Sequence, residues 1–350
     1  MRKSQTWPQG SVRRVTLDSA VLADNPWGDP VRRLLDIYVP AGYREDSPPP
    51  LFVYLAGFTQ SGLSQTNWSA FCENMPERLD RLIGQGRMGP VVVVFPDCFT
   101  RFGGNQYLNS AGVGRYEDYV IDEVVPFAEA QLCCGGRGRR AVIGKSYGGF
   151  GALMQAMRRP GVWSAVACHS GYMGFEQCYA NDLLVAATQL RRQGGTIEAF
   201  LSHFDATDPP SNNDVVTIAI LAVAASYDSD PNCPSRIRLP IDLNTGEIIL
   251  ERWAVWQRHD PLRVVREHAA ALRDLKALFI DCGDADEYHL QFGARRLKHL
   301  LDEAGVAHLY EEFAGGHEGI DHRLDESLVF LERALAEPAL TSIKSGHSRN

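Results

Sequence analysis

Short apolar runs alternate with amphipathic stretches along most of the chain. Eight runs have the length and composition of β-strands, and longer stretches between them repeat apolar residues at helical spacing. The predicted strands are residues 14–21, 34–39, 51–56, 90–96, 140–145, 163–169, 276–282 and 307–313, and the clearest predicted helices are 116–132, 287–303 and 323–336. Strands that alternate with helices predict a mainly parallel eight-stranded sheet with helices on both faces, opened by an antiparallel pair.

Residues 171–264 interrupt this alternation. They contain a predicted helix at 214–226, a loop rich in proline and a segment with two tryptophans. Open α/β sheets bind ligands at the carboxyl ends of their strands. We therefore predict an insertion between two core strands that packs over this edge as a cap and selects the substrate, rather than a solvated excursion. Residues 1–341 then form one domain, and the polar tail 342–350 is predicted to be disordered.

Composition and charge exclude several classes of protein. The 350 residues carry a net charge of −8, which gives no electrostatic footprint for nucleic acid or for an anionic membrane. The chain shows neither an apolar run of membrane-spanning length nor the apolar core of a signal peptide. Its eight cysteines are scattered without a C-x-x-C pair, which favours reduced thiols in a cytoplasmic protein. The spacing of His, Cys and Asp predicts neither a metal nor a cofactor, and the sequence carries no signal for an oligomeric state.

A glycine-flanked serine is the strongest chemical signal. Residues 144–148 read Gly-Lys-Ser-Tyr-Gly, after the apolar run 141–143 and before the predicted helix 150–157. Strand, G-x-S-x-G and helix together predict a nucleophile elbow, in which a sharp turn exposes the Ser146 hydroxyl. Gly-Lys-Ser also matches the end of a P-loop, but Arg139 occupies the place of that motif's first glycine.

A serine nucleophile needs a base, and the best candidate is His317. It lies in Phe-Ala-Gly-Gly-His-Glu-Gly, between the last predicted strand and the last helix. In this architecture the chain order is serine, acid, histidine, and a histidine on this loop can reach the elbow. His322 is the rival base. His169, at the end of the strand after the elbow strand, is predicted to be structural or to line the pocket.

The acid is expected after the penultimate strand, where the chain reads Asp-Cys-Gly-Asp-Ala-Asp-Glu. We choose Asp286 on the loop, with Asp284 second. Asp281 lies within the strand and is predicted to be a buried, satisfied polar residue. Capping of the next helix is the competing explanation for Asp284 and Asp286.

Two backbone N–H groups are needed to stabilise an oxyanion. The amide of Tyr147, the residue after the nucleophile, is one candidate. The other should come from the loop after the third strand, where the amide of Phe58 follows Gly57 and the amide of Thr59 is the alternative.

These motifs resemble those of the Putative esterase family of α/β-hydrolases, which includes esterase D, enterochelin esterases, feruloyl esterases and the antigen 85 mycolyltransferases. The similarity covers residues 34–335. It implies an α/β-hydrolase fold with Ser146 as nucleophile, Asp286 as acid and His317 as base, and with the amides of Phe58 and Tyr147 as the oxyanion hole. Lys145 departs from esterase D, which has histidine before the serine, and the oxyanion loop also differs. Formylglutathione is therefore a weaker candidate substrate.

The sequence thus predicts a serine esterase that hydrolyses small-molecule carboxylic esters through an acyl-enzyme. The same triad could serve an acyltransferase or a peptidase, because the cap and pocket choose the acyl acceptor. A non-catalytic binding protein with an inherited hydrolase fold is the alternative from another class, and it predicts that one catalytic role is unfilled.

Overall fold

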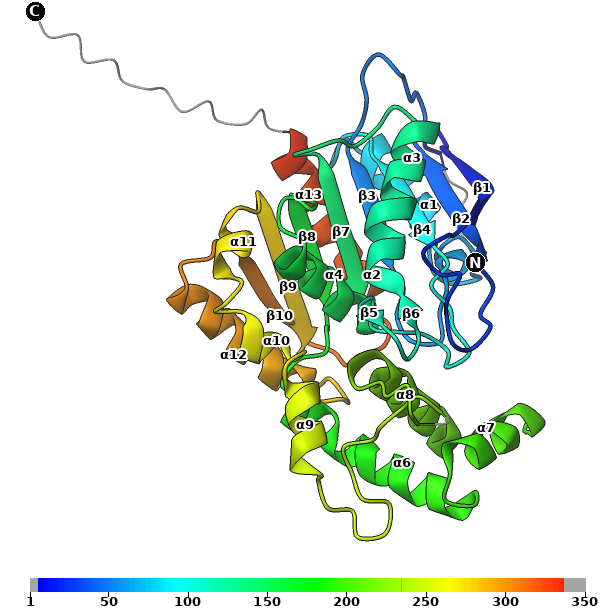
Figure 1. Ribbon diagram of the computed structural model, residues 1–350. Coiled ribbons are helices and arrows are strands. Elements are labelled where there is room, and N and C mark those ends of the chain that lie inside the picture. Colours follow the sequence, from blue (N-terminus) through cyan, green and yellow to red (C-terminus); the bar gives the residue numbers. More distant parts are fainter. Residues whose placement is uncertain (1–5, 234, 337–350) are drawn as a thin grey trace, which may run out of the picture.

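A single eight-stranded sheet organises the protein (Figure 1). The computed structural model describes residues 6–233 and 235–336, so the predicted disordered tail lies outside the described residues. The strand order is β1-β2-β4-β3-β7-β8-β9-β10. These strands are β1 (Ser11–Asp18), β2 (Arg32–Val39), β3 (Leu51–Leu55), β4 (Val92–Pro96), β7 (Arg140–Lys145), β8 (Ala165–His169), β9 (Ala277–Gly283) and β10 (Leu309–Phe313). A separate two-stranded ribbon joins β5 (Asn109–Ser110) to β6 (Gly114–Arg115).

The pairing confirms the predicted mainly parallel sheet. β1 and β2 are antiparallel, from Ser11 opposite Val39 to Asp18 opposite Arg32, and β2 is also antiparallel to β4. From β4 to β10 all neighbouring strands are parallel. The carboxyl ends of β3, β7, β8, β9 and β10 therefore meet at one edge of the sheet.

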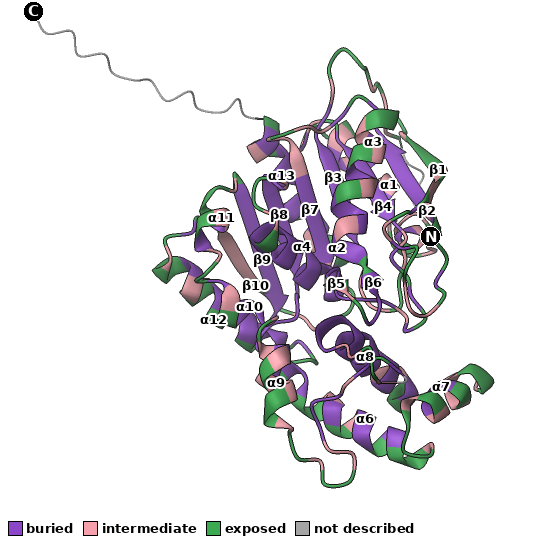
Figure 2. Ribbon diagram, viewed as in Figure 1, coloured by how far each residue is buried: buried purple, intermediate pink, exposed green. Residues whose placement is uncertain are grey.

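Helices cover both faces, and the alternation of side chains along the strands divides the core in two. Phe52 of β3 faces α1 (Met75–Gly84) and α13 (Leu324–Ala336), while Val53 faces the opposite side. That side is covered by α2 (Tyr116–Asp118) with α3 (Val125–Gln131), by α4 (Tyr147–Arg158), and by α11 (Ala269–Arg273) with α12 (Leu290–Glu303). Strands that are buried on both faces read as continuous apolar runs, and β3, β4 and β8 are buried throughout their length (Figure 2).

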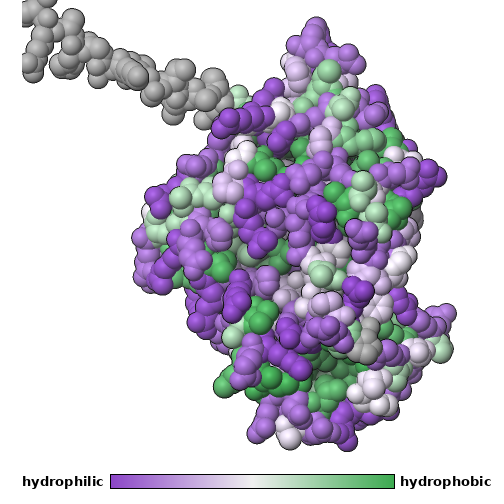
Figure 3. Space-filling model, viewed as in Figure 1, coloured by the Kyte–Doolittle hydropathy of each residue, from purple (hydrophilic) through white to green (hydrophobic). Residues whose placement is uncertain are grey.

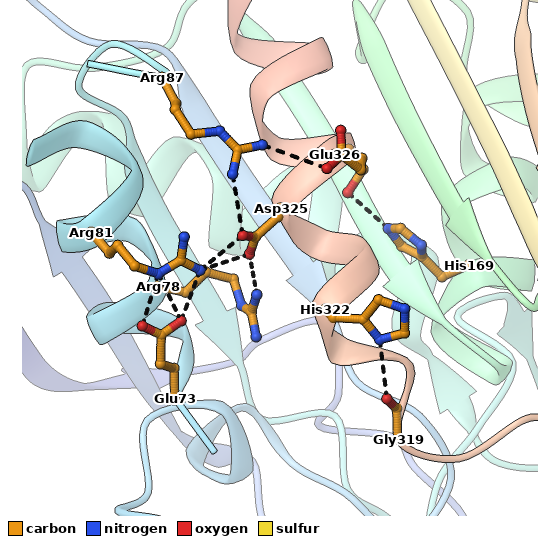
Figure 4. A network of polar contacts seen from close by, with 10 residues as sticks. Glu73, Arg78, Arg81, Arg87, His169, Gly319, His322, Asp325 and Glu326 are labelled. Carbon is orange, nitrogen blue, oxygen red and sulfur yellow. Dashed lines mark hydrogen bonds and ion pairs between the residues drawn. The ribbon is translucent and has the colours of Figure 1, made fainter. Parts of the chain in front are cut away.

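Two helices on one face are joined by an ionic cluster. Asp325, in the first turn of α13, contacts Arg78 and Arg81 of α1 and also Arg87 just beyond that helix (Figure 4). The distance from Arg81 Nη2 to Asp325 Oδ2 is 2.9 Å. These contacts fix the start of α13, which follows the loop of His317 after one short 3-10 helix (Ile320–Arg323).

A group of helices follows β8 and precedes β9 in the chain. In space it lies beyond the carboxyl ends of the strands (Figure 1). We refer to residues 171–264 as the cap. Its helices are α5 (Phe175–Cys178), α6 (Ala180–Arg192), α7 (Ile197–Ala206), α8 (Asn212–Tyr227), α9 (Leu250–Gln257) and α10 (Pro261–Val264). The sequence predicted α8 within two residues at each end, but did not predict α6 and α7. α8 packs against α6 and is buried over most of its length (Figure 2).

Hydrophilic side chains cover most of the molecular surface in the view of Figure 3, and apolar ones gather over the lower part that holds the cap. The cap includes three exposed apolar residues, Leu184, Ile248 and Leu250. Within the described ranges, we find no helix that combines the length and the apolarity needed to cross a bilayer.

Candidate active site

Ser146 occupies a sharp turn between β7 and α4. Its backbone has φ 59° and ψ −122°, a conformation that residues other than glycine rarely adopt. Two hydrogen bonds hold it there: the Ser146 amide donates to the His169 carbonyl at 2.9 Å, and the Phe150 amide donates to the Ser146 carbonyl at 3.0 Å. The serine therefore lies at the N-terminus of α4, where the first helical amides have no intrahelical acceptor and favour negative charge. This arrangement is that of the predicted nucleophile elbow.

The glycines on both sides of Ser146 are required by close backbone packing. A β-carbon on Gly148 would lie 1.9 Å from the Leu55 carbonyl oxygen, and one on Gly144 would lie 2.1 Å from the Gly148 carbonyl. Both obstacles are backbone atoms, which cannot move aside as a flexible side chain can. The turn and the neighbouring strand β3 thus exclude any side chain at these two positions.

We expect Gly148→Ala to destabilise the protein by about 4 kcal/mol or more, because its methyl group collides with the backbone of a central strand. The measurement is the free energy of unfolding from urea denaturation. Gly136→Ala is the matched control: Gly136 has φ 87° and open space around it, so alanine there adds only backbone strain of about 1 to 3 kcal/mol. Equal losses in the two variants would contradict the collision argument.

Asp286 and His317 come together at the ends of β9 and β10. The distance from His317 Nδ1 to Asp286 Oδ2 is 2.8 Å, and both side chains are buried. The other oxygen, Asp286 Oδ1, accepts a hydrogen bond from the Tyr288 amide at 2.9 Å. A backbone amide thus holds one carboxylate oxygen of Asp286, while the other oxygen orients the imidazole of His317.

Two neighbouring acids fix the histidine loop instead of contacting the imidazole. The His317 amide donates to Glu287 at 2.6 Å, and the Gly315 amide donates to Asp284 Oδ1 at 3.0 Å. The hydrogen bond from the His317 amide holds the pKa of Glu287 below its ordinary value. Asp284, the second choice for the acid, therefore anchors the loop. Glu287, which the prediction assigned to the start of a helix, does the same, and that helix begins only at Leu290.

A second Asp-His-Ser arrangement lies within the core. His169 Nδ1 is 2.8 Å from Asp281 Oδ1, and His169 Nε2 is 2.8 Å from the Ser327 hydroxyl. Asp281 also accepts from Arg323 Nε at 3.0 Å. Asp281, His169 and Ser327 are each at most 2% exposed, and none of them lines the cleft described below. We refer to Asp281, His169 and Ser327 as the buried relay. It joins β8, β9 and α13, so Asp281 is a buried, hydrogen-bonded structural residue, as the sequence predicted.

His322, the rival base, faces its own loop. Its ring nitrogen Nδ1 lies 3.3 Å from the Gly319 carbonyl, and the residue is exposed (Figure 4). The ring also packs edge-on against Phe313. His322 therefore belongs to the turn that precedes α13.

The loop after β3 lies against the serine. A β-carbon on Gly57 would be 3.6 Å from Ser146 Cβ, which shows how closely this loop approaches the elbow. The Thr59 amide donates to the Gly103 carbonyl at 2.8 Å, so this alternative oxyanion donor is engaged elsewhere. The Phe58 ring packs against the Tyr147 ring with centroids 5.3 Å apart, which places the two preferred donor residues side by side.

Ser146 and His317 open into one cleft of about 180 Å³. Aromatic rings surround the imidazole: the Tyr288 ring meets it edge-on at 4.8 Å between centroids, and the Tyr172 ring at 6.4 Å. The lining residues are Gly57, Phe58, Thr59, Gln60, Lys145, Ser146, Tyr147, Tyr172, Asp182, Val215, Val216, Ala219, Tyr288, His317 and Glu318. Asp182 on α6 and the three aliphatic residues on α8 come from the cap, which therefore forms one wall of the cleft.

A second cavity of about 250 Å³ adjoins this cleft. Both are lined by Gln60, Lys145 and Glu318, and the Lys145 ammonium lies 3.3 Å from Glu318 Oε2. Among the residues that the structure describes, no group of three or more His, Cys, Asp or Glu side chains is placed to hold a metal ion.

The sequence prediction missed several cleft residues, chiefly Asp182, Tyr172 and Tyr288. The helix that presents Asp182 had a detectable signal, because Leu183, Ala186, Ala187 and Leu190 recur at helical spacing. Its position in the cleft had no local signal, since it depends on how the cap packs onto the sheet.

Comparison with known proteins decides the family. The sequence profile of the Putative esterase family matches residues 31–325, most of the chain. The chain belongs to this family. It is therefore a carboxylic ester hydrolase with the α/β-hydrolase fold, as the sequence predicted, and small-molecule esters are its substrates. No curated protein matches the sequence.

Solved structures share this fold at low identity. The esterase is 20% identical to a ferulic acid esterase, with a TM-score of 0.55 over 93% of this chain and 99% of the other. It is 14% identical to FphF, a fluorophosphonate-binding serine hydrolase of Staphylococcus aureus, with a TM-score of 0.58 and coverages of 94% and 100%. It is 17% identical to an S-formylglutathione hydrolase of Agrobacterium tumefaciens, with a TM-score of 0.53 and coverages of 95% and 98%.

Proposed function

We propose that the esterase cleaves carboxylic esters through an acyl-enzyme on the triad Ser146, His317 and Asp286. His317 takes the proton of the Ser146 hydroxyl as the oxygen attacks the ester carbonyl, since a neutral alcohol is a weak nucleophile. Asp286 holds the imidazole through Nδ1–H and stabilises the imidazolium that forms. The protonated His317 then gives its proton to the leaving alcohol.

The tetrahedral oxyanion in this proposal is stabilised by the amides of Phe58 and Tyr147. The Tyr147 amide starts α4, where an N–H group is free of intrahelical partners. The Phe58 amide lies on the loop that approaches Ser146. Water then attacks the acyl-enzyme, with His317 again acting first as base and then as acid, and the free serine is restored.

One observation carries the proposal: His317, which is paired with Asp286, lines the same cleft as a serine on a strained strand-to-helix turn. The buried relay of Asp281, His169 and Ser327 has similar hydrogen bonds but does not line this cleft. An ester in the cleft can therefore reach the first arrangement and not the second, and we assign catalysis to the first.

Labelling with a fluorophosphonate probe tests the assignment, because the probe modifies only a serine that is activated as a nucleophile. We expect mass spectrometry of the digested protein to find the adduct on Ser146, and prior incubation with an ester substrate to slow its formation. Ser327 is the internal control and should stay unmodified in the folded protein. An unlabelled protein, or an adduct on another serine, would refute the proposed nucleophile and favour a non-catalytic or differently organised site.

A further inference from the structure

The cleft contains one acidic side chain that has neither a catalytic role nor an ion-pair partner among the described residues. Four titratable residues other than tyrosine line it: Lys145, Asp182, His317 and Glu318. Lys145 pairs with Glu318 and His317 pairs with Asp286. Asp182 has no salt bridge among the residues that the structure describes, and its polar neighbour is the adjacent Asn181 side chain.

Asp182 reaches the cleft from the cap. It lies in the first turn of α6, where an acidic residue also interacts favourably with the helix N-terminus. Helix stabilisation alone would be served equally well by a solvated carboxylate, as at Glu198 in the first turn of α7, which is exposed. Asp182 instead lies in partly buried surroundings, and this burial raises its pKa above the ordinary value. Its negative charge is therefore poorly compensated in the free enzyme.

Aromatic side chains line the same cleft as this carboxylate. Phe58, Tyr147, Tyr172 and Tyr288 line the cleft, and the Tyr147 and Tyr172 rings meet edge-on with centroids 4.9 Å apart. Aromatic faces attract cations, most strongly where water is excluded, and a carboxylate in the same enclosure adds a full opposite charge. The cleft thus holds both a carboxylate and aromatic rings, the two kinds of group that bind ammonium ions.

We propose that the cleft selects esters that carry a cationic ammonium group, with Asp182 as the specificity-determining residue. This inference rests on the proposed function, because the ester carbonyl must lie at Ser146 while the cation lies at Asp182. The paired Lys145 does not oppose it, since Glu318 compensates the lysine charge at the cleft edge. The cation can belong to the acyl or to the alcohol half of the ester, whichever half occupies the cleft.

Matched pairs of charged and neutral esters test this. p-Nitrophenyl 4-(trimethylammonio)butanoate and p-nitrophenyl 5,5-dimethylhexanoate differ in charge on the acyl side. Acetylcholine and 3,3-dimethylbutyl acetate differ in charge on the alcohol side. We expect the parent enzyme to prefer the cationic member of one pair by about tenfold or more in kcat/KM, mainly through KM. Asp182→Asn should remove that preference by lowering kcat/KM for the cationic ester about tenfold more than for its neutral isostere.

Two controls separate specificity from structure. Glu198→Gln removes an acid from the first turn of another cap helix and should change kcat/KM for neither the cationic nor the neutral ester. Methyl 3-(4-hydroxyphenyl)propanoate and methyl 3-phenylpropanoate differ by a neutral hydrogen-bond donor. A preference that depends on Asp182 in this pair, and not in the cationic pairs, would overturn the proposal in favour of hydroxyl recognition. Equal rates within both cationic pairs, or a cationic preference that survives Asp182→Asn, would also overturn it.

A binding measurement makes the inference independent of catalysis. Calorimetric titration of the four compounds of the cationic pairs into Ser146→Ala, and into Ser146→Ala with Asp182→Asn, measures affinity without turnover. We expect one cationic compound to bind the first protein about tenfold more tightly than its neutral isostere, and the difference to vanish in the second. If this binding is found but the parent hydrolyses none of the esters, the triad assignment fails and the cation site stands. If hydrolysis is found without the binding difference, the cation site fails and the triad stands.

Discussion

Ser146→Ala is expected to lower kcat about 10⁴- to 10⁶-fold, the loss that follows removal of the nucleophile from a serine triad. Without the hydroxyl, His317 has no proton to take and no acyl-enzyme can form. The residual rate would come from substrate binding and from the amides of Phe58 and Tyr147. The measurement is steady-state hydrolysis of a p-nitrophenyl ester, with KM reported separately because the alanine leaves the cleft walls intact.

The control for this prediction is Ser327→Ala, which removes the hydroxyl of the buried relay. Its loss leaves His169 Nε2 without its partner, so we expect a decrease of about 1 to 3 kcal/mol in the free energy of unfolding and little change in kcat. Ser146→Ala should show the opposite result, with stability near that of the parent and activity lost. Hydrolysis by Ser146→Ala at the parent rate would exclude Ser146 as the nucleophile.

Asp286→Asn is expected to lower kcat by about 10⁴-fold, because an amide does not hold the imidazole in the required tautomer or stabilise the imidazolium. The 2.8 Å contact between Asp286 and His317 is the interaction that changes, while the amide oxygen can still accept from the Tyr288 N–H. The rate is measured at saturating ester, which separates this effect from substrate binding.

Asp284→Asn is the matched variant on the same loop. Its side-chain oxygen can still accept from the Gly315 amide, so we expect kcat to stay within about tenfold of the parent. A larger loss of kcat in Asp284→Asn than in Asp286→Asn would reverse the assignment of the acid.

The sheet was predictable because its strands carry a strong local signal. β4 and β8 are buried on every residue and read as apolar runs, so their existence and order follow from the sequence. The ends of the strands were predicted less accurately. β1 was predicted three residues too late at both ends, because pairing with β2 and not apolar content decides where this exposed strand begins and stops.

The candidate site also combines features with a local sequence signal and features that depend on tertiary packing. Ser146, Asp286 and His317 stand in motifs whose glycines and strand boundaries are local, so sequence order alone brought them together as candidates. The prediction did not foresee that His169 and Asp281 form their own relay, because their contact depends on the register between β8 and β9. The identity of the cleft wall depended on the packing of α6 and α8, which no local pattern specifies.

The cleft takes its proposed chemistry and its shape from different stretches of polypeptide. The candidate nucleophile, acid and base follow strands of the sheet, whereas Asp182 and the aliphatic wall come from residues between β8 and β9. Variation confined to that one stretch can therefore change which ester is accepted while the reacting groups stay in place. A library of variants of α6 and α8 is thus a direct route to new selectivities in this enzyme.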